Sequence, residues 1–484
     1  MAERTLEEEY REYLDSLPIQ TLRTLGRKIG IPPESRKSKP GCLHAIIDLL
    51  MGRADPVPDS GKGAPVKQDY LDPSIIRHLE DLRLAQERKK GDRPLNTFTV
   101  HSPEQPKSIF DQPVYTGLLE ILPGGYGFLR TRKGQPTSGG DIFIAAPLIH
   151  SLSLREGDLV ACTAKPPENG EPSAMQELLS VNGIPFGEYE KRPKFDTLTP
   201  GYPTERILLS SANGELSLRM IDLFSPIGKG QRTIIVSPLD AGRLALLKEL
   251  AIACARMRPE LHLILLLLDE RPEDVTELRR AAPDAEFLSS TFDEEAARHV
   301  RLAELAVAHA KRLAESGRHV VVLMDSLTRL LRAYQLTSES PVKSSSMPDP
   351  GALTALKRLF GAARNTEEAG SITILATVPV EPGSRADGVL CEELSEAGNC
   401  KIVLTRTGSG RENACAIDPQ RSATRREELL LSPEELSLVR SIREKGWPQM
   451  QEDFLKLMKK TKNNAEFLAK SGELTAAKRK KEIK

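Results

Sequence analysis

The sequence predicts a multidomain α/β protein with a helical N-terminal domain, a small β-barrel and a larger domain built on a parallel sheet. Apolar residues recur at helical intervals in the first stretch of the chain. Between residues 115 and 181, short apolar segments alternate with Gly, Pro and Asp, as expected for the strands of a barrel. Beyond Pro203, continuous apolar strands are separated by helical stretches, which is typical of a parallel sheet buried on both faces.

Length and composition narrow the class further. The 484 residues fit roughly three domains of about 150 residues each. The 68 Lys and Arg residues balance 68 Asp and Glu residues, so a nucleic-acid site must be local rather than a property of the whole surface. The apolar run Leu263 to Leu268 has the length of a strand and not of a membrane helix. Six cysteines without a CxxC pair are expected to be reduced thiols, with no zinc site.

The N-terminus lacks the basic and apolar parts of a signal peptide, so we expect a cytoplasmic protein with no membrane partner. In chain order, we expect a helical domain at 1–52, a linker rich in Pro and charge at 53–112, an OB or cold-shock-like barrel at 113–186, a connector at 187–228, an α/β domain on a parallel sheet at 229–435, and C-terminal helices with a basic tail at 436–484.

Aromatic side chains in the barrel suggest a nucleic-acid surface. Tyr126 and Phe128 lie two residues apart, so on one strand both rings point to the same face, where they could stack on successive bases. Arg130 follows on that face and could hold a phosphate. The alternative is that alternate aromatics fill the core of the barrel.

The segment Thr233 to Leu244 stands where a phosphate-binding loop belongs, between a strand and a helix. Only Gly242 keeps the loop pattern, because Arg243 occupies the Lys position and Leu244 the Ser/Thr position. An ordinary strand–turn–helix is the alternative interpretation.

Two acids stand at strand ends. Glu270 follows LHLILLLL, and Asp325 ends HVVVLM as in a Walker B strand. Asp325 would suit Mg²⁺ positioning and Glu270 the activation of water, while the alternative for either acid is a helix N-cap.

Several long segments together resemble the bacterial transcription termination factor Rho, a family of hexameric RNA-dependent ATPases and helicases. The matching stretches are SPIGKGQR (225–232), LLDERPEDVTE (267–277), STFDEEAARHV (290–300), MDSLTRLLRAY (324–334), KRLFGAARN (357–365), AID…RSATRREELLL (416–431) and GLLEILPGGYGFLR (117–130). The resemblance implies that the α/β domain is a RecA-type P-loop NTPase-like domain that binds ATP and Mg²⁺.

The resemblance also implies roles for individual residues. Glu270 would be the catalytic base, Asp325 the acid on the magnesium side, and Arg425 an arginine finger offered to a neighbouring subunit. Nucleotide-binding residues would be Gly228, Lys229, Gly230, Gln231, Arg232, Thr233, Asp240, Ala241, Gly242, Arg243, Leu244, Ala245 and Arg271. RNA-binding residues would be Tyr126, Gly127, Phe128, Leu129, Arg130, Asp141, Ile142 and Phe143 in the barrel, and Lys343, Ser344, Ser345, Ser346, Met347 and Arg385 in the pore loops.

The departures from the family pattern gather around the nucleotide. Lys-Ala-Gly-Lys-Thr of the family is Asp240-Ala241-Gly242-Arg243-Leu244 here. Arg243 keeps the charge without the compact geometry of an ammonium, and Leu244 has no oxygen for Mg²⁺. The family's adenine-stacking aromatic corresponds to Ala414, and a family arginine to Glu412. Since each loss removes binding or charge stabilisation, we expect ATP turnover to be weak or absent.

Three hypotheses about function follow. The first is an RNA-binding factor in transcription termination, impaired as a motor, that forms a homohexameric ring or a mixed ring with an active Rho, with nascent RNA and RNA polymerase as partners. The second is a fully active, divergent ATP-dependent RNA translocase. The third is a non-enzymatic regulatory or structural oligomer. His spacings such as HxxxH or HExxH are absent, so the sequence gives no support for a histidine metal site.

Overall fold

The structure, a computed structural model, describes residues 6–54 (without 30, 33 and 52), 75, 79, 113–130, 140–165, 172–186, 188, 192–210, 215–238, 241–338, 347–381, 383–405, 417–445 and 447–471. It divides into two compact units, Met1–Val114 and Tyr115–Lys484. Among the described residues, no helix combines the length and apolar character that crossing a membrane requires.

The N-terminal unit is a small helical domain. It comprises α1 (Leu6–Ser16), α2 (Ile19–Ile29) and α3 (Lys39–Leu50). Ser38 begins α3 because its side chain accepts a hydrogen bond from the backbone N–H of Gly41, 3.2 Å away. Leu14, Leu22 and Leu25, spaced as the sequence analysis expected, are buried in the core of this unit.

The second unit begins with a β-barrel. Its elements are β1 (Val114–Ile121), β2 (Gly127–Arg130), β3 (Ile142–Ile144), α5 (Ala146–Ser151), β4 (Leu159–Lys165), β5 (Ala174–Val181) and β6 (Ile184–Pro185). The strand order is β3-β2-β1-β4-β5-β6, and a pairing between β3 and β5 closes the barrel. The prediction of an OB-like barrel is therefore confirmed. Its core is lined by Leu119, Leu129, Ile142, Ile144, Val160 and Cys162.

The third part is an α/β domain on a seven-stranded sheet with the order β10-β9-β11-β13-β8-β14-β15. Its strands are β8 (Arg232–Pro238), β9 (Leu261–Glu270), β10 (Glu286–Thr291), β11 (His319–Asp325), β13 (Ile372–Val380), β14 (Cys400–Val403) and β15 (Ala423–Thr424), of which only β15 is antiparallel to its neighbour. A separate antiparallel pair joins β7 (Pro200–Gly201) to β12 (Asn365–Thr366).

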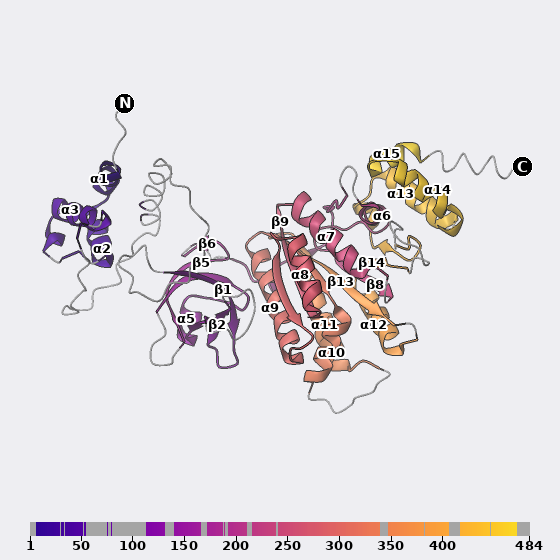
Figure 1. The fold of residues 1–484 in the computed structure, drawn as a ribbon, viewed down its shortest axis with the longest axis horizontal. Helices are drawn as coiled ribbons and strands as arrows, with labels where there is room; N and C mark the ends of the chain where they lie inside the picture. Colours follow the sequence, from indigo (N-terminus) through magenta and orange to yellow (C-terminus); the bar gives the residue numbers. More distant parts are fainter. Residues whose placement is uncertain are drawn as a thin grey trace, which may run out of the picture. The chain divides into compact units, whose positions relative to one another are not determined.

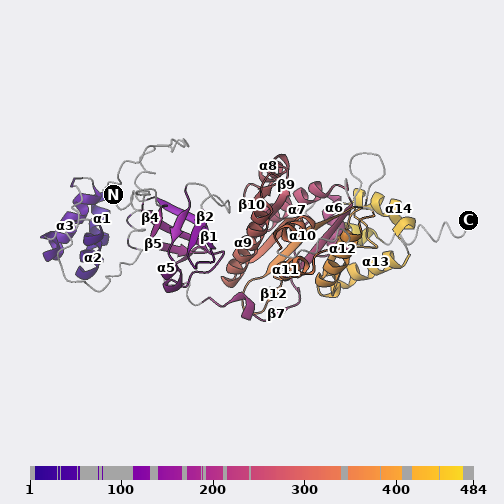
Figure 2. The ribbon, with the colours of Figure 1, turned by 90° about the horizontal axis from the view of Figure 1, so that it is seen from below.

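Helices cover both faces of the sheet, as the apolar strands predicted (Figures 1 and 2). The helices are α6 (Leu216–Phe224), α7 (Arg243–Met257), α8 (Pro272–Ala281), α9 (Ala296–Glu315), α10 (Leu327–Thr337), α11 (Pro350–Phe360) and α12 (Arg385–Ala397). Along β9, Leu263, Leu265 and Leu267 pack in the core that contains α6, α7 and α8. Ile264, Leu266 and Leu268 pack in the core that contains α9, α10, α11 and α12.

Three C-terminal helices extend the first of these cores. They are α13 (Pro433–Lys445), α14 (Trp447–Lys460) and α15 (Asn464–Lys470). Trp447 and Phe454 pack their rings 5.1 Å apart, and Phe454 lies 5.7 Å from Phe224 of α6. Trp447 is thus a packing residue.

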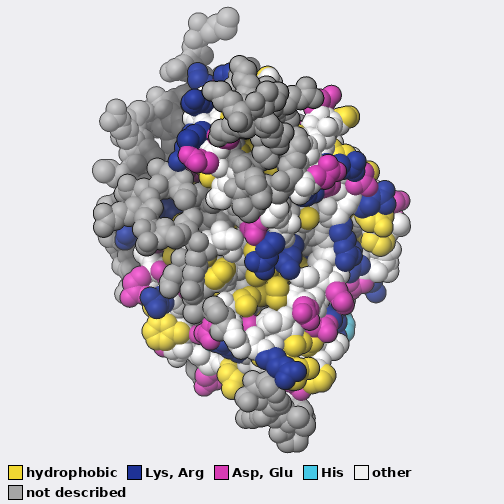
Figure 3. Space-filling model, turned by 90° about the vertical axis from the view of Figure 1, so that its right-hand side faces the viewer, with side chains coloured by type: hydrophobic (Ala, Val, Ile, Leu, Met, Phe, Trp, Pro, Cys, Tyr) yellow, Lys and Arg dark blue, Asp and Glu magenta, His cyan; other side chains and the backbone are white. Residues whose placement is uncertain are grey.

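On the face drawn in Figure 3, basic and acidic side chains are interspersed, in keeping with the balanced charge of the whole chain.

Candidate nucleotide site and nucleic-acid interface

The two predicted acids meet at one edge of the sheet. Glu270 is the last residue of β9 and Asp325 the last residue of β11. These strands are neighbours in parallel register, with Asp325 opposite Leu267, so both carboxylates lie at the C-terminal edge where α/β sheets bind their ligands. Both side chains are almost fully buried. The structure therefore brings these two residues together, as the sequence analysis expected.

Arg243 lies against both acids. It is the first residue of α7, and the turn before it is made by Gly242, whose φ of +77° is a conformation that favours glycine. The Nη1 and Nη2 atoms of Arg243 each donate to Oε1 of Glu270 over 3.2 Å. Arg243 also forms an ion pair with Asp325. Arg243 stands where the Rho resemblance places a phosphate-binding lysine. Its side chain is thus paired with two acids of its own chain.

A second arginine completes the cluster. Arg329 of α10 forms an ion pair with the same oxygen of Glu270, Oε1. It lies four residues after Asp325, in the first turn of the following helix, and was not among the residues predicted from the sequence. The cluster thus holds two guanidinium groups and two carboxylates, and its formal charges cancel.

The cluster shifts both carboxyl groups. Burial raises the pKa of Glu270, but the charges of Arg329 and Arg243 outweigh it and hold that pKa below its usual range. Burial raises the pKa of Asp325 to about 6, against the attraction of Arg243. Thr377 Oγ1 donates to Asp325 Oδ1 over 2.7 Å. Asp325 is therefore the group of the pair that binds a proton more readily.

These residues do not fit a magnesium ion in the place that the family implies. Leu244 offers no oxygen and packs its half-buried side chain on the apolar core of α7. One carboxylate oxygen of Asp325 accepts from Thr377 and the other pairs with Arg243. Both carboxylate oxygens of Asp325 thus have partners inside the protein, and a cation would have to compete with Arg243 for Oδ2.

The predicted barrel aromatics form one cluster outside the barrel core. The ring centroids of Tyr126 and Phe128 are 6.1 Å apart, those of Tyr126 and Phe143 5.9 Å, and those of Phe128 and Phe143 5.7 Å. Tyr126 is 38% exposed, and Phe128 and Phe143 are partly exposed. Leu129 and Ile142, the predicted RNA-binding residues between them, point into the core instead. The alternation of the strand thus separates a stacking surface from a core face.

Comparisons with known proteins identify the families that the α/β domain and the barrel resemble. The family model for the nucleotide-binding domain of the ATP synthase alpha/beta family matches residues 217–424, and the one for the RNA-binding domain of Rho termination factor matches residues 115–186. Transcription termination factor Rho of Borreliella burgdorferi is 43% identical over 362 residues, which are 73% of this chain and 70% of that protein. The chain belongs to the Rho family. Rho of Bacillus subtilis is 44% identical, over 72% of this chain and 83% of that protein. Rho of Streptomyces coelicolor is 41% identical, over 81% of this chain and 94% of that protein.

Among solved structures, an ATPase from the type III secretion system of pathogenic bacteria aligns with a TM-score of 0.44 at 24% identity, over 56% of this chain and 77% of that one.

One of the two segments that the Rho resemblance assigned to the nucleotide lies at the other edge of the sheet. Gly228 to Thr233 leads into the N-terminal end of β8, whereas Gly242 follows its C-terminal end. The structure therefore does not bring Gly228–Thr233 to the acids of the same chain. In this segment, Lys229 pairs with Glu205 at 2.5 Å, and Gln231 donates to the Asn399 side chain at 2.6 Å.

Arg425 lies at that same far edge. It follows β15, whose Thr424 pairs with Cys400 at the start of β14. Its side chain is exposed, and its backbone N–H donates to Asn399. Arg425 thus stands away from Glu270 of its own chain.

Other residues that the Rho resemblance pointed to have these positions. Arg271 is exposed at the start of α8, Ala241 is buried and Ala245 exposed, Arg385 is exposed at the start of α12, and Met347 is exposed before α11. Asp240, Lys343, Ser344, Ser345, Ser346, Glu412 and Ala414, with most of the linker and the basic tail, lie outside the described residues.

Arg130 shares the face of Phe128 but not its exposure. Its guanidinium lies 5.4 Å from the Phe128 ring centroid and pairs with Glu120 at 2.5 Å and Asp141 at 2.6 Å. All three charged side chains are buried. Arg130, held by Asp141, therefore packs beside the ring of Phe128, and the phosphate contact expected for Arg130 would require the loss of these pairs.

Proposed function

We propose that this chain is an RNA-binding member of the Rho family that acts in transcription termination and whose own ATP hydrolysis is weak or lost. The observation that carries the proposal is the contact of Arg243 with both Glu270 and Asp325. A base that activates water must accept a proton, and two guanidinium groups hold Glu270 in its ionised, already paired form. A phosphoryl group would have to displace Arg243 from both carboxylates before Arg243 could contact it.

RNA binding is supported by the barrel. The rings of Tyr126, Phe128 and Phe143 form a partly exposed platform, and stacking on such rings is tolerant of base identity. Single-stranded nascent RNA is therefore the proposed ligand. Met347 and Arg385 would add a second contact where a strand passes the α/β domain.

Assembly and surroundings form the finer part of the proposal. Arg425 is exposed at the sheet edge opposite its own acids, which supports a role toward the nucleotide of a neighbouring subunit. We propose a hexameric ring, homomeric or shared with an active Rho, in the cytoplasm and in contact with RNA polymerase. ATP would bind chiefly through the turn at Gly242, with weakened affinity.

The test is phosphate release by the purified full chain, with and without pyrimidine-rich single-stranded RNA. We expect RNA binding that falls with rising salt, and turnover well below about one per second. Turnover at or above that rate that is abolished by Glu270→Ala would overturn the loss of hydrolysis and support the second hypothesis, an active divergent Rho. That hypothesis has its own support in the retention of both strand-end acids.

The third hypothesis, an oligomer without RNA binding, would be supported if the full chain did not retain single-stranded RNA at low salt. Phosphate release and RNA retention are measured independently. The experiment therefore distinguishes a chain that hydrolyses ATP from a chain that does not bind RNA.

A further inference from the structure

Two histidines and a glutamate from separate elements meet away from the nucleotide site. His262 lies in β9, Glu286 begins β10 and His309 lies in α9. Glu286 pairs in register with Ile264, so His262, two residues earlier on β9, is its diagonal neighbour on the same face of the sheet. That face is covered by α9, whose residues Leu302, Ala306 and Leu313 pack there at the same helical intervals as His309.

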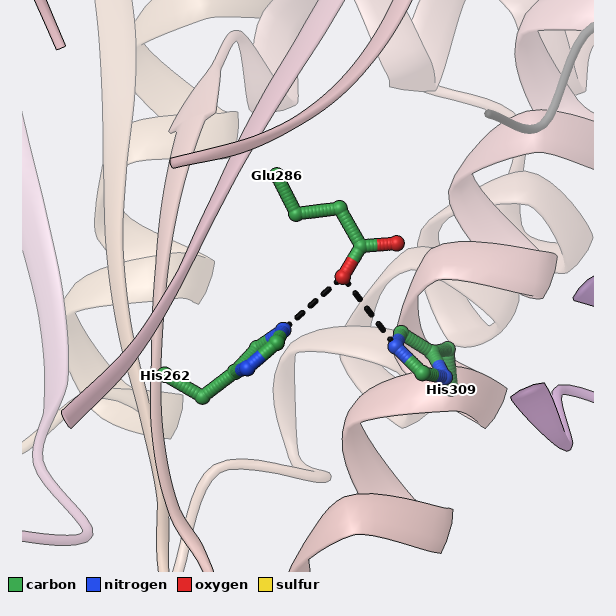
Figure 4. Close-up of side chains that lie close together, drawn as sticks. All are labelled: His262, Glu286 and His309. Carbon is green, nitrogen blue, oxygen red and sulfur yellow. Dashed lines mark hydrogen bonds and ion pairs between the residues drawn. The ribbon is translucent and has the colours of Figure 1, made fainter. Parts of the chain in front are cut away.

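Both imidazole rings contact the same carboxylate oxygen of Glu286 (Figure 4). Nε2 of His262 lies 2.8 Å from Oε2 of Glu286, and Nε2 of His309 lies 3.2 Å from the same atom. The two rings stand nearly perpendicular, with centroids 5.9 Å apart. The potential ligand atoms of the three residues all lie within 4.8 Å of one another.

The hydrogen bonding of His309 calls for a positive centre beside its Nε2. Its Nδ1 lies 2.8 Å from the carbonyl oxygen of Gly157, which can only accept, so Nδ1 carries the proton. In the neutral ring Nε2 then holds a lone pair, and it faces a carboxylate oxygen. Two lone pairs at 3.2 Å repel unless a positive centre stands between them. That centre is either a second proton on a fully buried imidazole or a metal ion.

The donor set selects the kind of metal. Imidazole nitrogens and a carboxylate are ligands that Zn²⁺ takes, and in a site with three protein ligands a water completes its four-coordinate shell. Tetrahedral bonds of about 2.0–2.1 Å place ligand atoms about 3.3 Å apart, so the observed 2.8 and 3.2 Å separations need only a small expansion. Ca²⁺ and Mg²⁺ prefer six or more oxygens and do not match. His262 and Glu286 also border a cavity of about 700 Å³, which leaves room for the water.

The surroundings give such an ion a structural role. The His309 Nδ1–H···O=C bond is the outer-shell contact that fixes a ligating histidine, and its acceptor lies in the turn before β4 of the barrel. Gly157 approaches α9 so closely that a Cβ atom on it would lie 2.4 Å from the backbone of Ala308 and His309. Arg155 of the same turn pairs with Glu315 of α9 at 3.0 Å. We propose that His262, Glu286 and His309 bind a zinc ion that braces α9 where the barrel turn packs on it.

The site has no signature in the sequence. The three residues are separated by 24 and 23 positions, a spacing without a fixed meaning in secondary structure, so the expectation of no zinc rested on local motifs alone. The proposal is independent of the proposed function, because it involves neither the acids at the sheet edge nor the aromatic platform.

The test is a Zn²⁺ titration of the full chain after removal of metal with a chelator, read by competition with a chromophoric chelator and by the visible spectrum of the Co²⁺ form. We expect one equivalent bound with a dissociation constant below about 10 μM, and an increase in the thermal midpoint on adding Zn²⁺. His262→Gln, Glu286→Gln and His309→Gln should each lose this equivalent, the Co²⁺ bands and the thermal shift.

His319→Gln is the matched control, because His319 is a half-buried histidine at the start of the neighbouring strand β11 and bonds Ser371 instead. It should bind like the parent. His262→Gln guards against misfolding, since His262 is 26% exposed whereas His309 is fully buried. No binding by the parent, or equal binding by the parent and the folded His262→Gln variant, would overturn the proposal and leave a protonated imidazole as the positive centre.

Discussion

Two guanidinium nitrogens of Arg243 donate to a single carboxylate oxygen of Glu270, each over 3.2 Å. A lysine at this position would carry one compact ammonium on a flexible stem, free to move between protein and phosphate. The planar fork of Arg243 is satisfied inside the protein, by Glu270 and by Asp325 beyond it. The substitution in the loop and the pairing of the acids are therefore two aspects of one change.

Restoring the family's side chains should restore catalysis. In the double variant Arg243→Lys with Leu244→Thr, the ammonium can reach a phosphate and the hydroxyl can reach a metal ion, so we expect RNA-stimulated phosphate release to increase by about 10²-fold or more. Steady-state phosphate release at saturating RNA measures it. Arg256→Lys, on an exposed face of the same helix, is the control and should leave the rate unchanged. Equal rates in the parent and the double variant would contradict the interpretation.

The raised pKa of Asp325 predicts a pH dependence of stability. With a folded pKa of about 6 against 3.8 in the unfolded chain, the folded state holds the proton more tightly, so the contribution is complete below the unfolded pKa and is lost as pH rises through about 6. Roughly two pKa units correspond to about 3 kcal/mol. Asp325→Asn cannot ionise and should escape this loss.

The test is to measure the thermal midpoints of the parent and of Asp325→Asn at about pH 4.5 and at about pH 7.5. The difference in midpoint, variant minus parent, should be larger at the higher pH. Asp453→Asn, an exposed carboxyl of α14, should show no such change with pH. A difference between variant and parent that stays constant with pH would refute the assignment.

The part of the site that lies at the ends of parallel strands could be predicted from the sequence. Glu270 and Asp325 could be placed together because parallel strands finish at one edge, whatever lies between them. The exposure of Phe128 and the burial of Leu129 follow from alternation, but which of the two faces was the core required the closed barrel.

Other features could not be predicted because they depend on side-chain partners far apart in the chain. Arg130 was expected to face RNA, yet Asp141 and Glu120 hold it in buried pairs. The contact of Arg243 with the acids depends on the conformation of a long side chain, which a substitution in a motif does not reveal. Arg329 could have been found, since it lies in the first turn of the helix that follows Asp325, and that turn begins at the sheet edge that carries both acids.

The aromatic platform predicts the loss of RNA affinity on truncation. Phe128→Ala removes one stacking ring worth about 1–3 kcal/mol, which is roughly a 5- to 150-fold weaker dissociation constant for single-stranded RNA. Fluorescence anisotropy with a pyrimidine-rich oligonucleotide measures it. Tyr202→Ala removes an aromatic ring that is 64% exposed outside the barrel and should bind as the parent does. Unchanged affinity on Phe128→Ala would exclude the platform as the primary site.

Arg130 should matter for stability more than for contact with RNA. Arg130→Gln leaves Asp141 buried without its cation, and breaking such a buried pair costs about 3–5 kcal/mol. Glu120 keeps Arg301 as a second partner, so Asp141 carries most of the cost. We expect a lower thermal midpoint for Arg130→Gln and none of that loss for Lys165→Gln, an exposed cation on β4. A parent-like midpoint together with lost RNA affinity would instead favour direct phosphate contact.

Two glycines with the same backbone angle distinguish strain from packing at the barrel turn. Gly157 and Gly317 both have φ of +82°, a region where a non-glycine residue costs about 1–2 kcal/mol. A Cβ on Gly317 would meet nothing within 4 Å, whereas one on Gly157 would overlap the backbone of α9. Gly317→Ala should therefore show only the conformational cost. Gly157→Ala should lower the thermal midpoint further and expose the turn to limited proteolysis, because the turn must move away from α9 and lose the bond to His309. If the two variants were equally stable and equally resistant to protease, the turn would not be held against α9.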